Sequence, residues 1–204
     1  IARFGPLVLH DISGYAIDMH TLSSSSGFKI DALLGYPFFQ NHAIRINYPK
    51  HTVTIYPTGT TPTCGKPIPI EIIHGTPVIT VKIASQAGVN AQTYHLIVDL
   101  GSRHHSYLGA AFLKTKSGEA LFAQGHTQQV GVGTAGVMKG IVTKVATLEI
   151  GTQHFHDVNF ALTRQVKAFN LQKLNGSLGV PFWKSGTITF DYPDKTLCIN
   201  MPQE

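Results

Sequence analysis

A short pattern near the start of this 204-residue chain returns near its end at a constant spacing. Leu34-Gly-x-Pro-Phe38 reappears as Leu178-Gly-x-Pro-Phe182, and Tyr48-Pro49 reappears as Tyr192-Pro193. Both pairs are 144 positions apart, since 178 − 34 and 192 − 48 give the same number. The same spacing relates three further pairs: Ile44 with Ile188, Thr52 with Thr196 and Ile55 with Ile199. Chance does not hold a register through this many positions, so the sequence indicates an internal duplication.

The two copies differ in extent. The second copy has a front half, at about residues 76–140, that has no counterpart in the first copy. We therefore divide the chain into the back half of a first unit at 1–57, a Pro- and Gly-rich linker at 58–75, and a complete second unit at 76–204. A β domain without its front half would leave strand edges unpaired. The sequence accordingly predicts that an upstream segment, a second chain or a second copy in a homodimer completes the first unit.

The composition favours a β protein and excludes some classes of partner. β-Branched residues dominate the short apolar runs, which 20 glycines and 11 prolines interrupt, and this pattern predicts an all-β fold with many turns. The net charge is +5, but Lys and Arg are scattered singly along the chain, which argues against nucleic-acid binding. No apolar run approaches the roughly 20 residues that span a bilayer, so we expect no membrane span.

The stretch 94–108 places an acid in an unusual setting. Residues 96–98 form a short apolar run with branched side chains, which predicts a buried strand, and Asp99 follows directly. Gly101 supplies backbone freedom for a sharp turn, and the hydroxyl of Ser102 can hydrogen-bond within it. A carboxylate at the end of a buried strand is costly to desolvate unless it is paired or used. This stretch alone fits an ordinary Asp-x-Gly turn or a catalytic carboxylate.

Several motifs of the second unit follow one another in the order typical of a known family. They are Pro77-Val-Ile-Thr-Val81, Leu96-Ile-Val-Asp99-x-Gly101, Val130-Gly-Val-Gly-Thr-Ala-Gly136, Leu148-x-Ile-Gly151, Leu178-Gly-Val-Pro-Phe182 and Ile188-x-Phe-Asp191-Tyr. In this order, residues 76–200 resemble a bacterial retropepsin-like aspartic peptidase domain, the unit that is duplicated in pepsin-type enzymes. Residues 1–57 resemble the back half of the same unit.

The resemblance implies a fold and a chemistry. The fold would be an acid-protease β-barrel unit, complete in the second copy, and Gly179 would allow close packing beside the turn of Asp99 and Gly101. Two such units would bring two aspartates together, so that the pair shares a proton and activates a water that attacks a peptide bond. Asp99 would be half of that dyad, no cofactor would be needed, and the substrate would be a peptide or protein. The positions expected beside the substrate are Ser102, Gly131, Gly133 and Thr134.

Leu100 departs from the family, which has Thr or Ser between the catalytic Asp and Gly. The hydroxyl of that residue bonds to the opposing loop in the family, and leucine cannot replace it, while Ser102 lies one position too far along. The departure leaves two functions open: an aspartic endopeptidase, or an inactive relative that binds a peptide or protein partner in the retained cleft. Residues 103–105, Arg-His-His, are cationic neighbours that we expect to lower the pKa of Asp99.

Other features keep more than one interpretation. The glycine-rich segment at 130–136 fits a mobile flap or a plain loop. His154 and His156 share one face of an expected strand, but no third ligand stands at a fixed spacing, so we predict surface histidines and no metal site, with metal-dependent chemistry as a remote alternative. Trp183 is expected in the core.

Cys64 and Cys198 allow one disulfide, which would join the linker to the last strand, and the sequence leaves both the bridged and the free state open. A bridge and the family resemblance favour an exported, periplasmic or secreted protein. In the first 30 residues we expect a hairpin around Ser13-Gly14 and a loop at 23–27.

Overall fold

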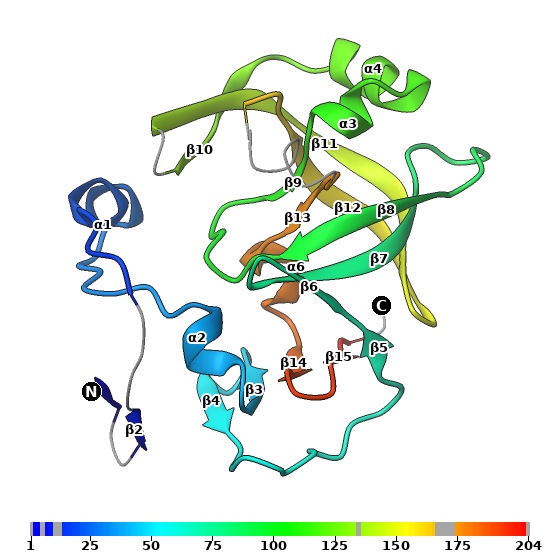
Figure 1. The fold of residues 1–204 in the computed structure, drawn as a ribbon. Coiled ribbons are helices and arrows are strands. Elements are labelled where there is room, and N and C mark those ends of the chain that lie inside the picture. Colours follow the sequence, from blue (N-terminus) through cyan, green and yellow to red (C-terminus); the bar gives the residue numbers. More distant parts are fainter. Residues whose placement is uncertain (1, 5–6, 10–13, 134–135, 166–173, 203–204) are drawn as a thin grey trace.

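Strands dominate the computed structural model, which confirms the expected all-β class. The structure describes the chain except for residues 1, 5–6, 10–13, 134–135, 166–173 and 203–204 (Figure 1). Among the residues it describes, no helix is both long enough and apolar enough to cross a membrane.

An eight-stranded sheet forms the upper part of the molecule in Figure 1. Its strands follow the order β10-β11-β12-β9-β13-β8-β7-β6, with a further pairing of β11 and β7 that folds the sheet back on itself. Two helices, α3 (Ala110–Leu113) and α4 (Lys116–Ala123), follow strand β9 in the chain. The strands are β6 (Glu71–Ile73), β7 (Thr76–Ala84), β8 (Gln92–Val98), β9 (Ser106–Leu108), β10 (Gln128–Gly133), β11 (Gly136–Ile150), β12 (Gln153–Leu162) and β13 (Gly176–Leu178).

A five-stranded sheet lies below the first sheet and combines three strands from residues 43–69 with the last two strands of the chain (Figure 1). Its order is β4-β3-β14-β15-β5, and every pairing is antiparallel. The strands are β3 (Ala43–Asn47), β4 (Thr52–Ile55), β5 (Ile68–Pro69), β14 (Thr187–Asp191) and β15 (Thr196–Asn200). Strands expected from both stretches of the sequence repeat therefore meet in one sheet.

The repeated sequence forms the same elements at the same spacing. The helix α2 (Tyr36–Phe39) recurs 144 positions later as α6 (Val180–Trp183), and β3 recurs as β14. These two strands pair antiparallel, and Arg45 lies opposite Thr189, which is its own counterpart 144 positions on. The Nε of Arg45 donates to Oγ1 of Thr189 at 3.1 Å. A strand that pairs with its own counterpart around a central residue relates the two copies by a local two-fold axis.

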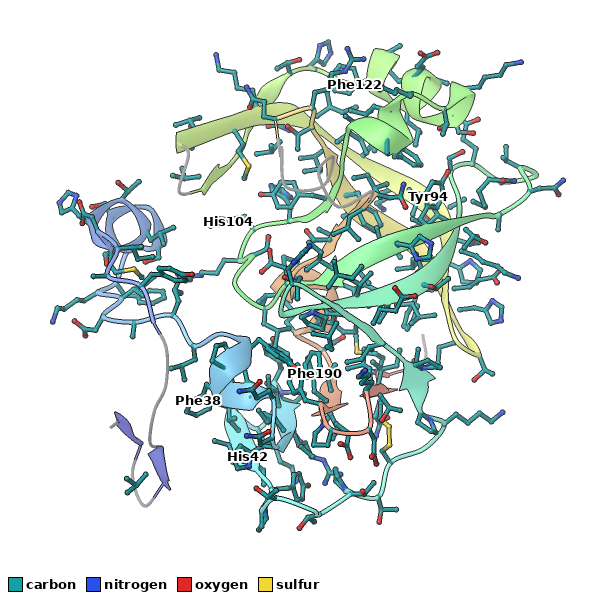
Figure 2. All side chains as sticks on the ribbon, in the orientation of Figure 1. Phe38, His42, Tyr94, His104, Phe122 and Phe190 are labelled. Carbon is teal, nitrogen blue, oxygen red and sulfur yellow. A yellow bond between two sulfur atoms is a disulfide. The ribbon has the colours of Figure 1, made fainter. Side chains whose placement is uncertain are left out.

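One apolar core runs through both sheets. It contains Leu96 and Leu148 of the large sheet together with Ile188 and Phe190 of the small one, all of them almost completely buried. Trp183 is fully buried in the same cluster, which confirms its expected place in the core. Figure 2 shows how densely side chains fill the space around Phe38, Phe190 and Tyr94. Both copies are thus held in a single body by apolar burial.

Two local expectations were wrong. Instead of a hairpin around Ser13-Gly14, β1 (Ala2–Phe4) pairs with β2 (Leu7–Leu9), and 14–19 has no regular structure. The expected loop at 23–27 is mostly helix α1 (His20–Ser26), which ends at Gly27 in a left-handed conformation. Serine disfavours a helix only slightly, so four successive serines can lie in α1. The left-handed conformation of Gly27 ends the helix.

The stretch 58–75 is more than a connection. It contains β5, which pairs with β15 in the small sheet, and β6, which pairs with β7 in the large sheet. The prolines and glycines predict a linker, yet Pro69 lies in β5, at the edge of the small sheet. Proline has no backbone N–H, and an edge strand tolerates this because one of its sides makes no hydrogen bonds to a neighbouring strand.

Cys64 and Cys198 form a disulfide across a sequence separation of 134 residues. The bridge fixes the proline-rich stretch to β15, on the opposite side from the apolar core that Leu197 enters. The bond closes a loop that includes nearly all of the second unit, from residue 76 to Cys198, so it restricts the unfolded chain strongly.

Replacing both cysteines, Cys64→Ser with Cys198→Ser, is expected to lower the free energy of unfolding by about 2–5 kcal/mol. Chemical denaturation with and without reductant measures this. Reductant should destabilise the wild type and leave the double variant unchanged. Equal stability of the oxidised and reduced wild type would contradict a structural bridge.

Candidate active site

Asp99 follows directly after strand β8, at the end of the large sheet. The side chains of β8 alternate, with Tyr94, Leu96 and Val98 buried, and Asp99 follows the last of them half-buried. The N–H of Gly101 donates to Oδ1 of Asp99 at 3.0 Å. The strand and the turn are as expected from the sequence.

Strand β13 holds the Asp99 turn in place. It inserts between β8, which it pairs with in parallel, and β9, which it pairs with antiparallel. The carbonyl of Leu178, at the end of β13, accepts the N–H of Asp99 at 3.0 Å and the indole Nε1–H of Trp183 at 3.0 Å. One buried carbonyl thus ties the acidic turn to Trp183, the largest fully buried side chain among the described residues.

Gly179 lets the backbones approach closely at this point. A Cβ atom built on Gly179 would lie 2.3 Å from the carbonyl oxygen of His105 and 2.8 Å from that of Ser102. The N–H of Gly179 donates to Oγ of Ser106 at 3.1 Å, and the N–H of Val180 donates to the Ser102 carbonyl at 2.8 Å. The expected packing of Gly179 beside the acidic turn is therefore present.

Burial governs the charge state of Asp99. Loss of hydration raises the pKa of its carboxyl, while the backbone N–H groups of Gly101 and Ser102 oppose that shift. Among the described residues, no second carboxylate contributes to it. We expected the Arg-His-His run to lower this pKa, and that was wrong.

The reason lies in where these cationic side chains point. The Nη1 of Arg103 donates to the carbonyl of Ser26 at 2.7 Å, and its guanidinium lies 4.7 Å from the ring centroid of Phe28. Arg103 thus points towards α1 and the segment after it, rather than to Asp99. His104 is exposed on the loop (Figure 2), and burial together with His104 lowers the pKa of His105.

The residues around the acid have roles that the sequence did not all reveal. Leu100 is half-buried against the main core, so its side chain leaves the turn rather than facing an opposing loop. Ser102 donates its hydroxyl to the carbonyl of His105 at 2.7 Å and so stabilises its own turn. Gly101 lies in the expected turn without adopting a left-handed φ. Its lack of a side chain matters because a Cβ there would lie 3.3 Å from Oδ1 of Asp99.

The glycine-rich segment forms a β-hairpin. Strands β10 and β11 pair from Gln128 opposite Gly140 to Gly133 opposite Gly136, with an irregularity in register between Gln129 and Gly131. Thr134, an expected substrate contact, lies outside the described residues. Gly133 is the last residue of β10. Contact of Gly133 or Thr134 with a substrate stays a prediction.

Tyr107 connects the region of Asp99 to this hairpin. Its hydroxyl donates to the carbonyl of Val130 at 2.8 Å, at the register irregularity. A Cβ on Gly131 would lie 2.4 Å from that hydroxyl, so glycine is required there by packing. Burial and the charge of Asp99 raise the pKa of Tyr107, and a bond with Ser102 opposes the shift. Sequence reasoning missed Tyr107, since an aromatic residue in an apolar strand gives no sign of such a link.

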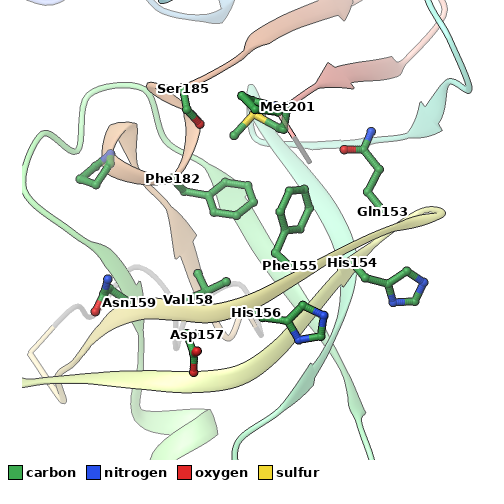
Figure 3. Close-up of a pocket in the computed structure, with 12 residues that line it drawn as sticks. Gln153, His154, Phe155, His156, Asp157, Val158, Asn159, Phe182, Ser185 and Met201 are labelled. Atoms are coloured by element: carbon green, nitrogen blue, oxygen red, sulfur yellow. The ribbon is translucent and has the colours of Figure 1, made fainter. Parts of the chain in front are cut away.

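Three cavities lie away from Asp99. One of about 470 Å³ lies beside β12 and α6, where Phe155 packs edge to face on Phe182 and Met201 closes one side (Figure 3). His154 and His156 point away from these rings. The other two have volumes of about 450 and 590 Å³, and Asp99 lines none of the three. No three of the described His, Cys, Asp and Glu side chains gather where a metal ion could be held.

Comparisons with known proteins find distant similarity among solved structures. No model of a known protein family matches the sequence. No curated protein matches it either. Among solved structures, the chain is similar to the crystal structure of a retropepsin-like aspartic protease from Rickettsia conorii, with 13% sequence identity and a TM-score of 0.47. The similarity covers 68% of this chain and 92% of that chain. At this distance it carries no argument about function, which has to be inferred from the residues around Asp99.

The variant Gly179→Ala is expected to lower the free energy of unfolding by about 1–3 kcal/mol, because the new methyl group would overlap two backbone carbonyls. Gly14→Ala is the matched control, since no atom lies within 4 Å of the position of its Cβ. Urea denaturation of both variants measures the difference. Equal stabilities would show that the turn does not need this close approach.

The variant Tyr107→Phe is expected to lower the free energy of unfolding by about 1–3 kcal/mol, because the carbonyl of Val130 loses the hydrogen bond from the Tyr107 hydroxyl. Amide exchange at Gly131 should accelerate more than exchange in β7. Tyr15→Phe, at a side chain that is 97% exposed, serves as the control. Unchanged exchange in the hairpin would contradict the link between Tyr107 and Val130.

The contribution of Asp99 to the stability of the wild type should fall as pH rises through the window that begins at the ordinary Asp pKa of 3.8. The folded state raises the pKa of Asp99, so it binds this proton more tightly than the unfolded chain, and ionisation favours unfolding. Asp99→Asn removes that charge. The variant should therefore gain stability over the wild type between about pH 3 and about pH 7, as thermal unfolding at both values would show. A pH-independent difference would contradict the raised pKa.

Proposed function

We propose that this protein is an aspartic-type endopeptidase in which Asp99 supplies one carboxylate of a dyad. The observation that supports this most directly is the setting of Asp99. The carboxyl stands at the end of a buried strand, its turn is fixed by the Leu178 carbonyl and the close approach of Gly179, and burial raises its pKa. A half-buried acid held this firmly, with no cation paired to it among the described residues, suits proton transfer.

The reaction needs a second carboxylate close to Asp99. Two carboxyl groups a few ångströms apart share one proton, because both cannot ionise at that separation. The ionised member takes a proton from a water molecule as the water attacks the peptide carbonyl, and the protonated member donates a hydrogen bond to the carbonyl oxygen. The raised pKa of Asp99 suits the protonated role at mildly acidic pH. The partner carboxylate would lie in an upstream segment or a second subunit.

The hairpin of β10 and β11 is proposed as a flap at 126–140 that covers an extended peptide. Tyr107 supports this role, since its hydroxyl ties the carbonyl of Val130 at the base of the hairpin to the neighbourhood of Asp99. Gly131 and Gly133 on β10 would then lie along the substrate backbone, where small residues permit close approach.

A second function is favoured by Leu100. Its side chain packs against the core, so the turn lacks the hydroxyl with which the family holds two carboxylates in position. A chain with this turn could bind a peptide or protein in the cleft without hydrolysing it. The two functions share the cleft and differ in chemistry alone.

We also propose that the repeat at a spacing of 144 arose by duplication, and that the protein works in an exported, periplasmic or secreted setting. The matching bounds of α2 and α6 and of β3 and β14 support the duplication. The disulfide of Cys64 and Cys198 supports an oxidising compartment.

Peptide cleavage from about pH 3 to about pH 7 tests the enzyme directly. We expect cleavage at acidic pH that pepstatin inhibits, and a loss of at least about a hundredfold in kcat/KM in Asp99→Asn, since general acid–base groups contribute that much or more. Asp157→Asn, at an exposed acid in β12, is the control and should keep its activity.

Cleavage that survives Asp99→Asn would place the chemistry elsewhere. If the folded wild type, in its full natural length, cleaves no peptide at any pH, the binding function is the correct one. Binding of pepstatin without cleavage, measured by calorimetry, would show directly that the cleft is retained.

A further inference from the structure

The small sheet has two faces of opposite character. Ile44 of β3, Ile188 of β14 and Leu197 of β15 belong to the apolar core. Because side chains alternate along a strand, their neighbours in the sequence lie on the opposite, outer face. The strand register sets these neighbours in two rows, with one residue from each strand in each row. They are Arg45 and Asn47 on β3, Thr187 and Thr189 on β14, and Cys198 and Asn200 on β15.

A cavity of about 590 Å³, which we call the outer groove, lies over this polar face. Residues 63–65 form its other wall, and the disulfide of Cys64 and Cys198 holds that wall against the sheet. The volume falls within the range of roughly 300–1,000 Å³ that is common for small-molecule sites. Among the described residues that line the outer groove, Arg45 alone carries a charge. The groove therefore combines one cation with neutral hydroxyl and amide groups.

The guanidinium of Arg45 is held in place before any ligand arrives. Its Nε donates to Oγ1 of Thr189 at 3.1 Å, and its Nη2 donates to the carbonyl of Thr63 at 2.9 Å. The guanidinium carbon also lies 5.4 Å from the ring centroid of Tyr56. These contacts fix the side chain from the sheet, from the wall of the groove and from its own strand's neighbour β4. A ligand that binds Arg45 would thus find its partner already ordered, which lowers the entropic cost of binding.

These contacts leave the charge of Arg45 without a counter-ion. A guanidinium has five N–H donors, and the two hydrogen bonds use two of them. Among the described residues, no carboxylate forms an ion pair with Arg45. Asp191, two positions beyond Thr189 on β14, does not line the groove, and its Oδ1 accepts the N–H of Asp194 at 3.2 Å. A half-buried cation with donors to spare is a strong point of attraction for an anion.

We propose that the outer groove is a binding site for a small polar carboxylate. A guanidinium matches the two oxygens of a carboxylate geometrically, and its single positive charge balances the single negative charge of that group. A phosphate monoester carries about −1.5 to −2 charges at pH 7, so one arginine would leave it incompletely neutralised. The side chains of Thr187 and Asn200 can bond to hydroxyl or amide groups elsewhere on the ligand.

This site is separate from the proposed peptidase site. Asp99 does not line the outer groove, which lies on the face of the small sheet turned away from the core. Two kinds of molecule carry the required chemistry: a small hydroxy acid, and the C-terminal residue of a peptide. Both present one carboxylate beside further polar groups.

Titration of the ¹⁵N-labelled 204-residue chain at low ionic strength, followed by NMR, tests the proposal with both kinds of ligand. The probes are D-gluconate and the dipeptide N-acetyl-Gly-Thr, and their neutral counterparts are glucose and the C-terminal amide of the same dipeptide. At least one carboxylate should shift the Nε–H signal of Arg45 and the amide signals of Thr187 and Asn200 saturably. Its neutral counterpart should bind about tenfold more weakly or less, because the ion pair is lost. The tighter of the two carboxylates identifies the kind of ligand.

Three variants locate the site. Arg45→Gln should weaken binding about tenfold or more, since it removes the charge and the paired donors. Arg164→Gln is the matched control, because its guanidinium also lies on an aromatic ring, 5.2 Å from the centroid of Phe122, but outside the groove. Its affinity should equal that of the wild type. Asn200→Asp, at an exposed side chain whose change the fold tolerates, should weaken binding about threefold by repulsion at low ionic strength.

The proposal is overturned if neither carboxylate gives saturable shifts, or if the neutral counterparts bind as tightly. It is also overturned if folded Arg45→Gln keeps the affinity of the wild type. Should Arg45→Gln fail to fold, Asn200→Asp decides, and an unchanged affinity in that variant would place the ligand elsewhere. Tighter binding of inorganic phosphate than of both carboxylates would reject the proposed class of ligand.

Discussion

The carbonyl of Leu178 is the point on which the candidate site depends. It accepts the N–H of Asp99 and the indole N–H of the fully buried Trp183, so the acidic turn is anchored to the centre of the core. Gly179 makes that anchoring possible because any side chain there would overlap the carbonyls of His105 and Ser102. A carboxyl group fixed in this way loses part of its hydration, and its pKa rises as a consequence.

The second organising feature is the pairing of β3 with β14. Arg45 lies opposite its own counterpart Thr189, so the two copies of the repeat meet around a local two-fold axis within one sheet. The disulfide and strand β5 hold the connecting stretch against that sheet. The small sheet thereby fixes residues 175–179, which hold the Asp99 turn, relative to their counterparts at 31–35, with which no described strand pairs.

Sequence patterns predicted the features that depend on local chain properties. The strand at 96–98 and the turn after it follow from branched residues and from an acid and a glycine at the end of the strand. The tight packing at Gly179 was expected from the resemblance to a known family, and it is present. Features that depend on distant contacts were not predictable. Arg103 points to Ser26, 77 positions away, and Tyr107 bonds to Val130, because tertiary packing rather than neighbouring sequence selects those partners.

Native-state amide exchange at residues 178–180 and at residues 33–35 tests the central claim most directly. The account predicts slow exchange at Leu178, Gly179 and Val180, whose N–H groups lie within the packed site, and nearly unprotected exchange at Leu33, Leu34 and Gly35. Equal protection of the two segments in the isolated chain would contradict it, because residues 33–35 would then be packed as firmly as the segment that holds the Asp99 turn, or neither segment would support a turn.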